Sequence, residues 1–302
     1  MKRLPQIALL PDGKRLHLQD GPIDLVIEAK GQAAEIRTAY DAAARRFTGL
    51  LDELCEELPT LREAADPEKS TLKGVVARRM HAAVAPFAAD HFITPMAAVA
   101  GSVAEEILSA MLGVARLDRA YVNNGGDIAL HLAEGKQFSV GLMDRPDQHG
   151  LMGTTIIDAD DPARGIATSG RHGRSFSLGI ADAVTVLART ASQADAAATI
   201  IGNAVDLPGH PAIVRCPANE LQPDSDLGAR LVTRDVGSLT ENEVEAALRA
   251  GGSCAQQLFA AGLIEGAALR LLGETRVVGT TGSATSALQA LHGSAIESTV
   301  HA

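Results

Sequence analysis

Hydrophobic and polar positions follow two different periods along the chain, which predicts an α+β fold. The first thirty residues hold short β-type runs separated by the turn sequences PDGK and DGP, so we expect a β-hairpin at the start. From Gln32 to about Leu58 the apolar positions recur at helical spacing, and Pro59 ends the run. A second, Ala-rich helix is predicted at 96–112, directly after Pro95.

The rest of the chain predicts further strands and two more helices. Ser192 is the N-cap candidate for a helix that ends near Asn203 and Pro208, and a last helix spans about 241–261. No internal repeat or long linker interrupts this order, so we predict a single domain over residues 1–302, with a mixed or antiparallel sheet and flanking helices. The tail after residue 280 is rich in Gly, Ser and Thr and is expected to be flexible. The predicted strands lie at about 119–122, 128–132 and 138–142, at two places within 164–188, and near 267–272 and 276–278.

The composition indicates a globular protein and argues against binding to nucleic acid. Of the 302 residues 46% are hydrophobic, enough for a substantial core, but only 3% are aromatic and none is Trp, so base-stacking surfaces are not expected. A net charge of -10 opposes general attraction to phosphate backbones or anionic lipid, although a local arginine cluster can still hold a phosphorylated small molecule. We therefore expect neither nucleic acid nor membrane as a partner, and a homodimer is compatible with helices rich in Ala and Leu.

Cysteines and targeting signals point to one compartment. Cys55, Cys216 and Cys254 are odd in number and far apart, so they predict neither a disulfide framework nor a zinc site and fit a reducing environment. The N-terminus offers only the apolar run IALL before Pro11, too short for a signal peptide. The longest apolar stretch, 92–104, is shorter than the ~20 residues that span a bilayer and is interpreted as buried core. These features predict a cytoplasmic protein.

Asp195 and Thr199 are candidate metal ligands because they lie four residues apart on a predicted helix and so share a face. Two oxygens at this spacing suit a hard cation such as Mg²⁺, which takes its other ligands from water and phosphate. In the structural alternative, Thr199 bonds back to the backbone and Asp195 stabilises a helix N-terminus. Spacing alone favours the structural alternative.

Two glycine-rich segments are candidate ligand sites. A hairpin turn would need only Asn-Gly, so the longer NNGGD at 123–127 favours a loop with a further role, since successive N–H groups in such turns bind anions. A plain Gly-rich turn is the alternative. The segment TSGRHGRS at 168–175 combines arginines and hydroxyls in a composition suited to phosphate oxygens, and a solvated loop explains it equally well.

The order of three segments, VNNGGDIAL, GIATSGRHGRSF and VTVLARTASQADAAATI, resembles the ApbE-like superfamily, whose best-known members are FAD:protein FMN transferases. Those proteins carry an N-x-GGDI loop, an IATSG strand end and a TVxAPTAxxADALATAL segment in this order, and PMAAVAGSVAEE is similar to their Gly/Ala-rich helix start. The resemblance covers about residues 94–205. Over its whole length the chain is most similar to a cytoplasmic ApbE-related family, for which the resemblance implies no activity.

The resemblance implies a flavin site and a magnesium site. The glycines of NNGGD would let a large ligand approach the backbone closely. Asp195 and Thr199 would bind Mg²⁺ together with the backbone carbonyl near Ala100. With the arginine-rich loop added, the residues expected to contact FAD or a related flavin nucleotide are Asn124, Gly125, Gly126, Asp127, Ser169, Gly170, Arg171 and Arg174.

The chain also departs from the transferases. They carry an H-x-x-DP motif after the SG loop, where this chain reads SFSLGIAD, and the lysine of their GGIAKG helix start is replaced by Gly101. Flavinylation of a protein needs an activated acceptor hydroxyl, so we expect weak FMN transfer or none. His172 and Asp182 are the candidates to act as the base, although neither matches the position of the missing motif.

Three functions stay open. The first is Mg²⁺-dependent phosphoryl-type transfer or pyrophosphate cleavage on a small phosphorylated ligand, in which metal and loop neutralise the phosphate charge. The second is a non-catalytic nucleotide- or flavin-binding protein that has lost the transferase chemistry. The third is an assembly or scaffold subunit.

Overall fold

A nine-stranded sheet forms the centre of the structure, a computed structural model that describes residues 4–145, 148–279 and 299–301. The strand order is β1-β2-β3-β4-β5-β8-β9-β12-β13, and all neighbours run antiparallel. Along β3 the sequence IDLVIEAK alternates buried and half-buried residues, which puts its apolar side chains on one face. The strands are β1 (Gln6–Leu9), β2 (Leu16–Asp20), β3 (Ile23–Lys30), β4 (Arg119–Asn124), β5 (Asp127–Leu132), β8 (Gly165–Ser169), β9 (Ala183–Ala188), β12 (Gly266–Leu271) and β13 (Glu274–Gly279).

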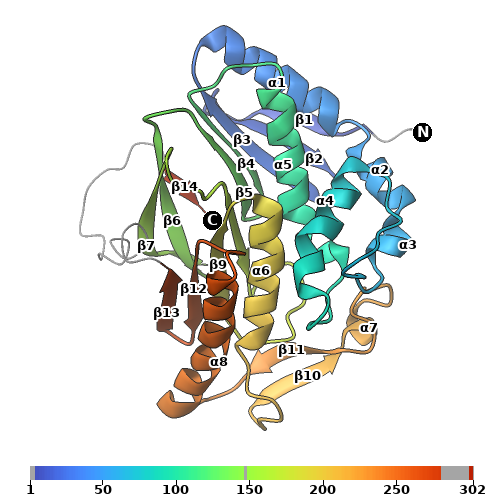
Figure 1. The fold of residues 1–302 in the computed structure, drawn as a ribbon, viewed down its shortest axis with the longest axis vertical. Helices are drawn as coiled ribbons and strands as arrows, with labels where there is room; N and C mark the ends of the chain where they lie inside the picture. Colours follow the sequence, from blue (N-terminus) through green and yellow to red (C-terminus); the bar gives the residue numbers. More distant parts are fainter. Residues whose placement is uncertain (1–3, 146–147, 280–298, 302) are drawn as a thin grey trace.

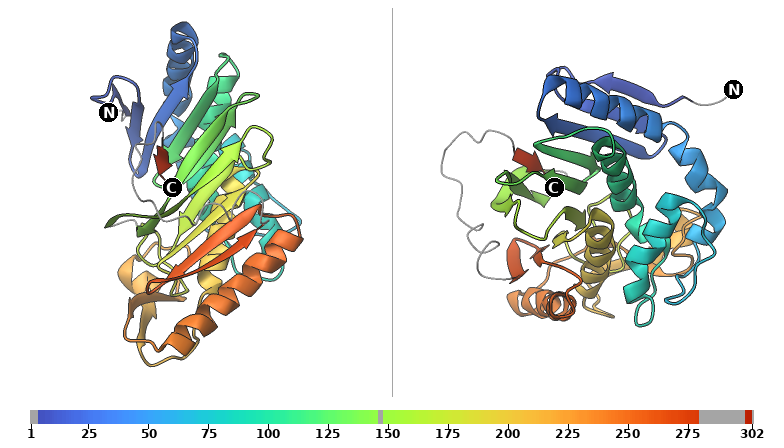
Figure 2. Two further views of the ribbon diagram at one scale, coloured as in Figure 1. Left: turned by 90° about the vertical axis from the view of Figure 1, so that its left-hand side faces the viewer. Right: turned by 45° about the horizontal axis from the view of Figure 1, so that its top comes forward.

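Helices cover one face of this sheet (Figures 1 and 2). Helix α1 packs on β2, α5 on β4 and β5, α6 on β8 and β9, and α8 on β12 and β13. Helix α8 begins with a capping box in which Thr240 and Glu243 bond each other's backbone N–H. The helices are α1 (Ala33–Phe47), α2 (Leu50–Glu56), α3 (Leu58–Leu61), α4 (Val75–Val84), α5 (Val99–Leu112), α6 (Ala191–Ala204), α7 (Ala218–Leu221) and α8 (Glu241–Ala260), with 3₁₀ turns η1 (Ala85–Phe87) and η2 (Pro95–Ala98).

Two smaller sheets complete the fold. In one of them, β6 (Gln137–Arg145) pairs antiparallel with β7 (Gln148–Asp158) and parallel with β14 (Thr299–His301). Its buried side chains Phe138, Val140 and Ile157 join an apolar cluster with residues of β4 and β5. The other is the hairpin of β10 (Ile213–Pro217) and β11 (Leu231–Val236). The predicted α+β class, with mixed and antiparallel sheets and flanking helices, is confirmed.

The helix predicted from Gln32 to Leu58 is wrong as a single element. The chain breaks at Gly49, whose φ of +88° is unfavourable for other residues, and α2 and α3 follow as separate helices. Pro59 lies in the first turn of α3 rather than after the helix, a position where its missing N–H does no harm. Helix α4, strand β7 and the β10–β11 hairpin had no counterpart in the sequence prediction. The predicted tail after residue 280 falls, up to residue 298, outside the described residues.

The prediction of a buried segment at 92–104 concerns η2 and the start of α5. Among the described residues, Pro95–Leu112 is the one helical stretch long and apolar enough to cross a membrane by length and composition. Half of it is buried within the fold, where α5 packs against α1, α4 and α6 as well as the sheet. The packing therefore accounts for its apolar sequence as that of a core helix.

Candidate functional site

The segment NNGGD forms the turn between β4 and β5. Asn124 and Asp127 are the last paired residues of the two strands, so only Gly125 and Gly126 connect them. Their φ values of +67° and +113° match a two-residue hairpin turn that needs positive φ at both central positions. The Asn123 side chain accepts the Gly126 N–H at 2.8 Å. In its backbone the segment is therefore a two-residue hairpin turn, for which Gly-Gly is one of the suitable pairs.

The turn leaves its backbone accessible to a ligand. A Cβ placed on Gly126 would meet no atom within 4 Å, and one on Gly125 would lie 3.4 Å from the guanidinium carbon of Arg174. Arg174 itself is exposed. The glycine turn and the TSGRHGRS loop, far apart in the sequence, therefore lie against each other.

Asp127 connects the turn to the end of β8. Its carboxylate accepts the Thr168 N–H at 3.3 Å. Loss of water around this partly buried group raises the pKa of Asp127 to about 7, against the opposing effects of the Thr168 N–H and the nearby charge of Arg174. Asp127 is thus a carboxylate that titrates near neutral pH.

Asp195 lies where the first turns of α5 and α6 meet. Its Oδ2 accepts the Gly101 N–H at 3.0 Å, so it stabilises the N-terminus of α5 rather than that of its own helix. Desolvation raises the pKa of Asp195 well above its usual range, and repulsion from Asp127 raises it further, although the backbone N–H groups of Gly101 and Ala100 oppose both. The two carboxylates therefore lie close enough to interact.

Ala100 and Thr199 were predicted to share a metal site with Asp195. The Ala100 carbonyl accepts the Asn124 side-chain amide at 3.1 Å, which brings the turn to the start of α5. Thr199 follows Asp195 by one turn of α6. The structure thus gathers oxygen atoms from the β4–β5 turn, α5 and α6, a set suited to a hard cation. No group of three or more His, Cys, Asp and Glu side chains placed for a metal occurs among the described residues.

The two arginines of the loop have different partners. Arg171 forms an ion pair with Asp182 at 2.7 Å, and both side chains are largely buried. His172 Nε2 lies 3.2 Å from the same carboxylate oxygen, and the Leu272 N–H donates to the other oxygen at 2.6 Å. Asp182 therefore ties the loop to the β12–β13 turn, which leaves Arg174 as the loop arginine beside the glycine turn.

The remaining loop residues lie in close backbone contacts. A Cβ on Gly170 would lie 2.4 Å from the Asp182 carbonyl oxygen, so only glycine fits there. Ser169, the last residue of β8, has its hydroxyl 3.7 Å from the position of a Cβ on Gly202 in α6. Gly170 thus packs against the start of β9, and Ser169 against the C-terminal half of α6.

Sequence reasoning missed how α5 and α6 are joined. The N-cap of α6 is Thr190, which accepts the Gln193 N–H, and the prediction of Ser192 as the N-cap is wrong. Ser192 is the second helical residue, and its N–H donates to Glu105 of α5 at 2.6 Å. Thr190 and Ser192 both carry a hydroxyl that could cap a helix. In the structure Thr190 is the cap, and the Ser192 N–H binds Glu105, 87 positions away along the chain. The signal in the sequence was the pair Glu105 and Glu106, which follows the apolar stretch at 92–104.

Fold and site together define an α+β protein whose candidate site lies where α5, α6 and the β4–β5 turn meet. The profile of the family described as AbpE bacteria matches residues 7–277. The chain therefore belongs to the bacterial AbpE family, and the resemblance noted from the sequence is confirmed.

Relatives of this chain are found in archaea. A UPF0280 protein of Methanopyrus kandleri is 38% identical over 179 residues, which cover 59% of this chain and 69% of that protein. UPF0280 proteins of Archaeoglobus fulgidus and Methanothermobacter thermautotrophicus are 39% and 40% identical over 116 and 119 residues. Those two matches cover 37% and 38% of this chain and span 45% and 44% of the relatives' own length.

Solved structures give more distant matches. A variant of the flavin transferase ApbE from Vibrio cholerae has a TM-score of 0.45 at 12% identity, covering 89% of this chain and 98% of its own. The apo form of the Pseudomonas stutzeri flavinyl transferase ApbE has a TM-score of 0.46 at 12% identity, covering 92% and 95%.

Proposed function

We propose that the protein binds a flavin nucleotide or a related phosphorylated ligand together with Mg²⁺ at the junction of α5, α6 and the β4–β5 turn. The observation that carries this proposal is the pair of Asp127 and Asp195: desolvation raises the pKa of both carboxyl groups, and repulsion from Asp127 raises the pKa of Asp195 further. A divalent cation beside them would neutralise this repulsion and bind better as the pair ionises.

The residues present fit Mg²⁺. Asp195, the Ala100 carbonyl and the Thr199 hydroxyl would supply oxygen ligands, and Asp127 lies beside them with a second carboxylate. Two carboxylates are few for a cation held by protein alone, but Mg²⁺ commonly keeps waters and completes its coordination with substrate phosphates. When bound, the ion would neutralise charge on a phosphate group of the ligand.

The protein itself would orient the phosphates. Arg174 is exposed beside the glycine turn, where its guanidinium would donate charge-assisted hydrogen bonds to phosphate oxygens. The open backbone at Gly126 would allow a ligand to approach closely. The flavin in the proposal rests on family membership and on the N-x-GGDI, IATSG and ADAAAT segments.

The reaction proposed for this site is transfer of a phosphoryl-type group or cleavage of a pyrophosphate. An acceptor oxygen, from water or a hydroxyl, forms a bond to one phosphorus as the bridging oxygen leaves with the other phosphate, and the acceptor proton passes to a base. His172 is the proposed base, since Asp182 beside it already accepts from Arg171 and the Leu272 backbone. Charge neutralisation and geometry supply most of the rate in such reactions.

A second candidate function is binding without chemistry. The cluster around Asp182 favours it, because three donors bind this carboxylate and fix the loop to the β12–β13 turn. Both oxygens of the Asp182 carboxylate are thus occupied by donors of the protein itself. In this alternative the site would hold the nucleotide and Mg²⁺ and release both unchanged.

One experiment separates these functions. Purified protein is titrated with FAD, with and without Mg²⁺, by flavin fluorescence, and the mixture is then analysed by chromatography for FMN and AMP. Asp195→Asn tests the site, and Asp235→Asn, at an exposed position on β11, is the matched control. Mg²⁺-dependent binding with FMN release supports the enzyme, and binding alone supports the second candidate. Absence of both in the wild type would refute the proposal.

A further inference from the structure

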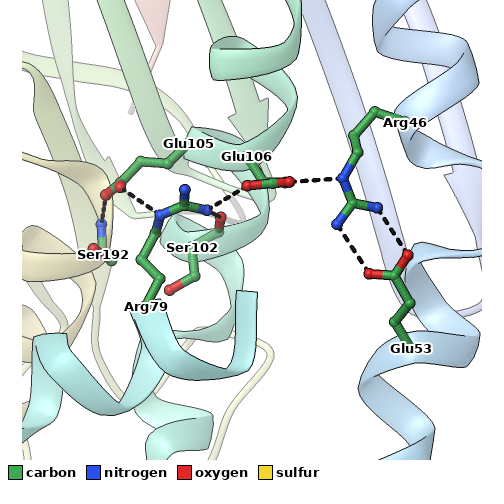
Figure 3. Close-up of polar contacts among 7 residues, drawn as sticks. All are labelled: Arg46, Glu53, Arg79, Ser102, Glu105, Glu106 and Ser192. Carbon is green, nitrogen blue, oxygen red and sulfur yellow. Dashed lines mark hydrogen bonds and ion pairs between the residues drawn. The ribbon is translucent and has the colours of Figure 1, made fainter. Parts of the chain in front are cut away.

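A network of charged side chains connects α1, α2, α4 and α5 with the start of α6 (Figure 3). Its centre is Glu105 of α5, one oxygen of which accepts the Ser192 N–H at 2.6 Å. That N–H belongs to the first turn of α6, where no intrahelical acceptor exists. Glu105 therefore caps α6 from outside.

The bonds across the junction are reciprocal. Glu105 of α5 accepts from the start of α6, and Asp195 of α6 accepts from Gly101 at the start of α5. The two helices also touch through their backbones, since a Cβ on Gly101 would lie 2.3 Å from the Ala191 carbonyl oxygen. The junction therefore has little freedom to shift, and whatever holds Glu105 also holds the backbone that carries Asp195.

Arg79 of α4 holds Glu105 in place. Its Nε lies 3.2 Å from the second Glu105 carboxylate oxygen, and its Nη1 contacts Glu106 at 3.0 Å and the Ser102 carbonyl at 3.1 Å. The glutamates are shielded, with side-chain exposures of 19% and 12%. One guanidinium thus binds two carboxylates and a backbone carbonyl about one helical turn before them.

The network extends to the surface through Glu106. Arg46 Nε donates to Glu106 at 2.6 Å, and its terminal nitrogens bind Glu53 of α2. Burial alone would raise the pKa of Glu106, but hydrogen bonds from Arg46 and Arg79 outweigh it and hold that pKa below its usual range. Glu53, half exposed, ends the network on the side away from α6.

We propose that Glu105, oriented by Arg79, is a positioning residue for the cation site. It touches neither ligand nor cation, and it acts by fixing the first turn of α6 so that Asp195 and Asp127 face one cation. The inference rests on the proposed function, because it assigns a role toward the same Mg²⁺. Outer residues that orient metal ligands commonly change metal affinity by 10- to 100-fold when removed.

The test measures Mn²⁺ affinity of the full chain by calorimetry, with and without saturating FAD, alongside urea stability. Glu105→Ala should weaken Mn²⁺ binding about 10-fold, and Glu105→Gln should weaken it less, because its amide oxygen still accepts the Ser192 N–H although its amide nitrogen cannot accept from Arg79. Glu53→Ala is the matched control. It removes an ion pair of the same network without touching Glu105, and it should leave Mn²⁺ affinity unchanged.

The outcomes distinguish this inference from the proposed function. Wild-type affinity in folded Glu105→Ala, or an equal loss in Glu53→Ala, would overturn the positioning role while Asp195→Asn still abolished binding. If Glu105→Ala does not fold, Arg79→Lys decides, because it keeps the charge but cannot reach two carboxylates and a carbonyl with a planar fork. Arg79→Lys should weaken Mn²⁺ binding, and unchanged affinity would contradict the positioning role of Glu105. No Mn²⁺ binding by wild type would refute both ideas.

Discussion

Replacing Asp127 with Asn removes one of two repelling carboxylates and keeps an oxygen that accepts the Thr168 N–H. The pKa of Asp127 is raised to about 7 in the folded protein, from 3.8 in its ordinary environment. Between these values the unfolded chain releases a proton that the folded protein still binds. Stability in metal-free buffer therefore falls as pH rises from about 4 to about 7, and the loss from this residue is complete above pH 7.

The expected effect is large enough to measure. Each unit of pKa difference corresponds to about 1.4 kcal/mol, so the two pH units between 5 and 7 change the free energy of unfolding by roughly 3 kcal/mol. Asp127→Asn cannot titrate and should lack this part of the pH dependence. It should also relieve the repulsion on Asp195, so the variant is expected to be the more stable protein at pH 8 and close to wild type at pH 5.

Urea unfolding at pH 5, 6, 7 and 8, with chelator present, provides the measurement, and Asp235→Asn serves as the surface control. Mg²⁺ at pH 8 should raise the stability of wild type, because a cation that binds the folded protein stabilises it. The stability of Asp127→Asn should stay largely unchanged by Mg²⁺, since this variant lacks one of the two carboxylates. Parallel pH profiles for wild type and Asp127→Asn would show that the carboxylate is not desolvated and would refute the reasoning.

Other predictions concern the same site. Asp195→Asn should keep the bond to the Gly101 N–H and remove most Mg²⁺ affinity without unfolding α6, and equal Mg²⁺ binding by variant and wild type in calorimetry with ligand present would count against it. Arg174→Ala should weaken nucleotide binding about 10-fold with little change in stability, whereas Arg171→Ala should lower stability by roughly 3 kcal/mol because the buried Asp182 loses its arginine ion pair. Fluorescence titration and thermal unfolding check this contrast, and the reverse pattern would contradict it. With FAD, Mg²⁺ and an acceptor peptide, we expect weak or no covalent FMN attachment, and a rate equal to that of a known transferase would show that the missing H-x-x-DP motif is not essential.

Much of the fold could be predicted from local patterns. The strands of the central sheet after residue 119, and helices α5, α6 and α8, follow from apolar periodicity, because each buries one stripe or face against the sheet. The break at Gly49 could not be predicted, since a glycine within a helical pattern is often tolerated. The β10–β11 hairpin is half-buried or exposed along most of β10 and gives a weak pattern.

The site was predictable as a set of segments but not as a geometry. The order of the three motifs predicted Asp127, Ser169 and Asp195 as site residues, and the structure places their elements side by side. The interaction between Asp127 and Asp195 depends on a hairpin turn and a helix that meet only in the folded chain. The contact of Glu105 with α6 could not be predicted for the same reason. Its partner is a backbone N–H group, and the sequence does not indicate which backbone group a side chain will bind.

The α5–α6 junction carries a carboxylate where a neutral cap would serve the helix equally well. An Asn or Ser side chain would satisfy the Gly101 N–H without placing a second carboxylate near Asp127. The chain instead carries Asp195 there, and the resulting repulsion lowers stability at neutral pH. Natural sequences retain such locally unfavourable arrangements mainly where a ligand requires them. The balance of these effects supports the proposal that a cation completes this site.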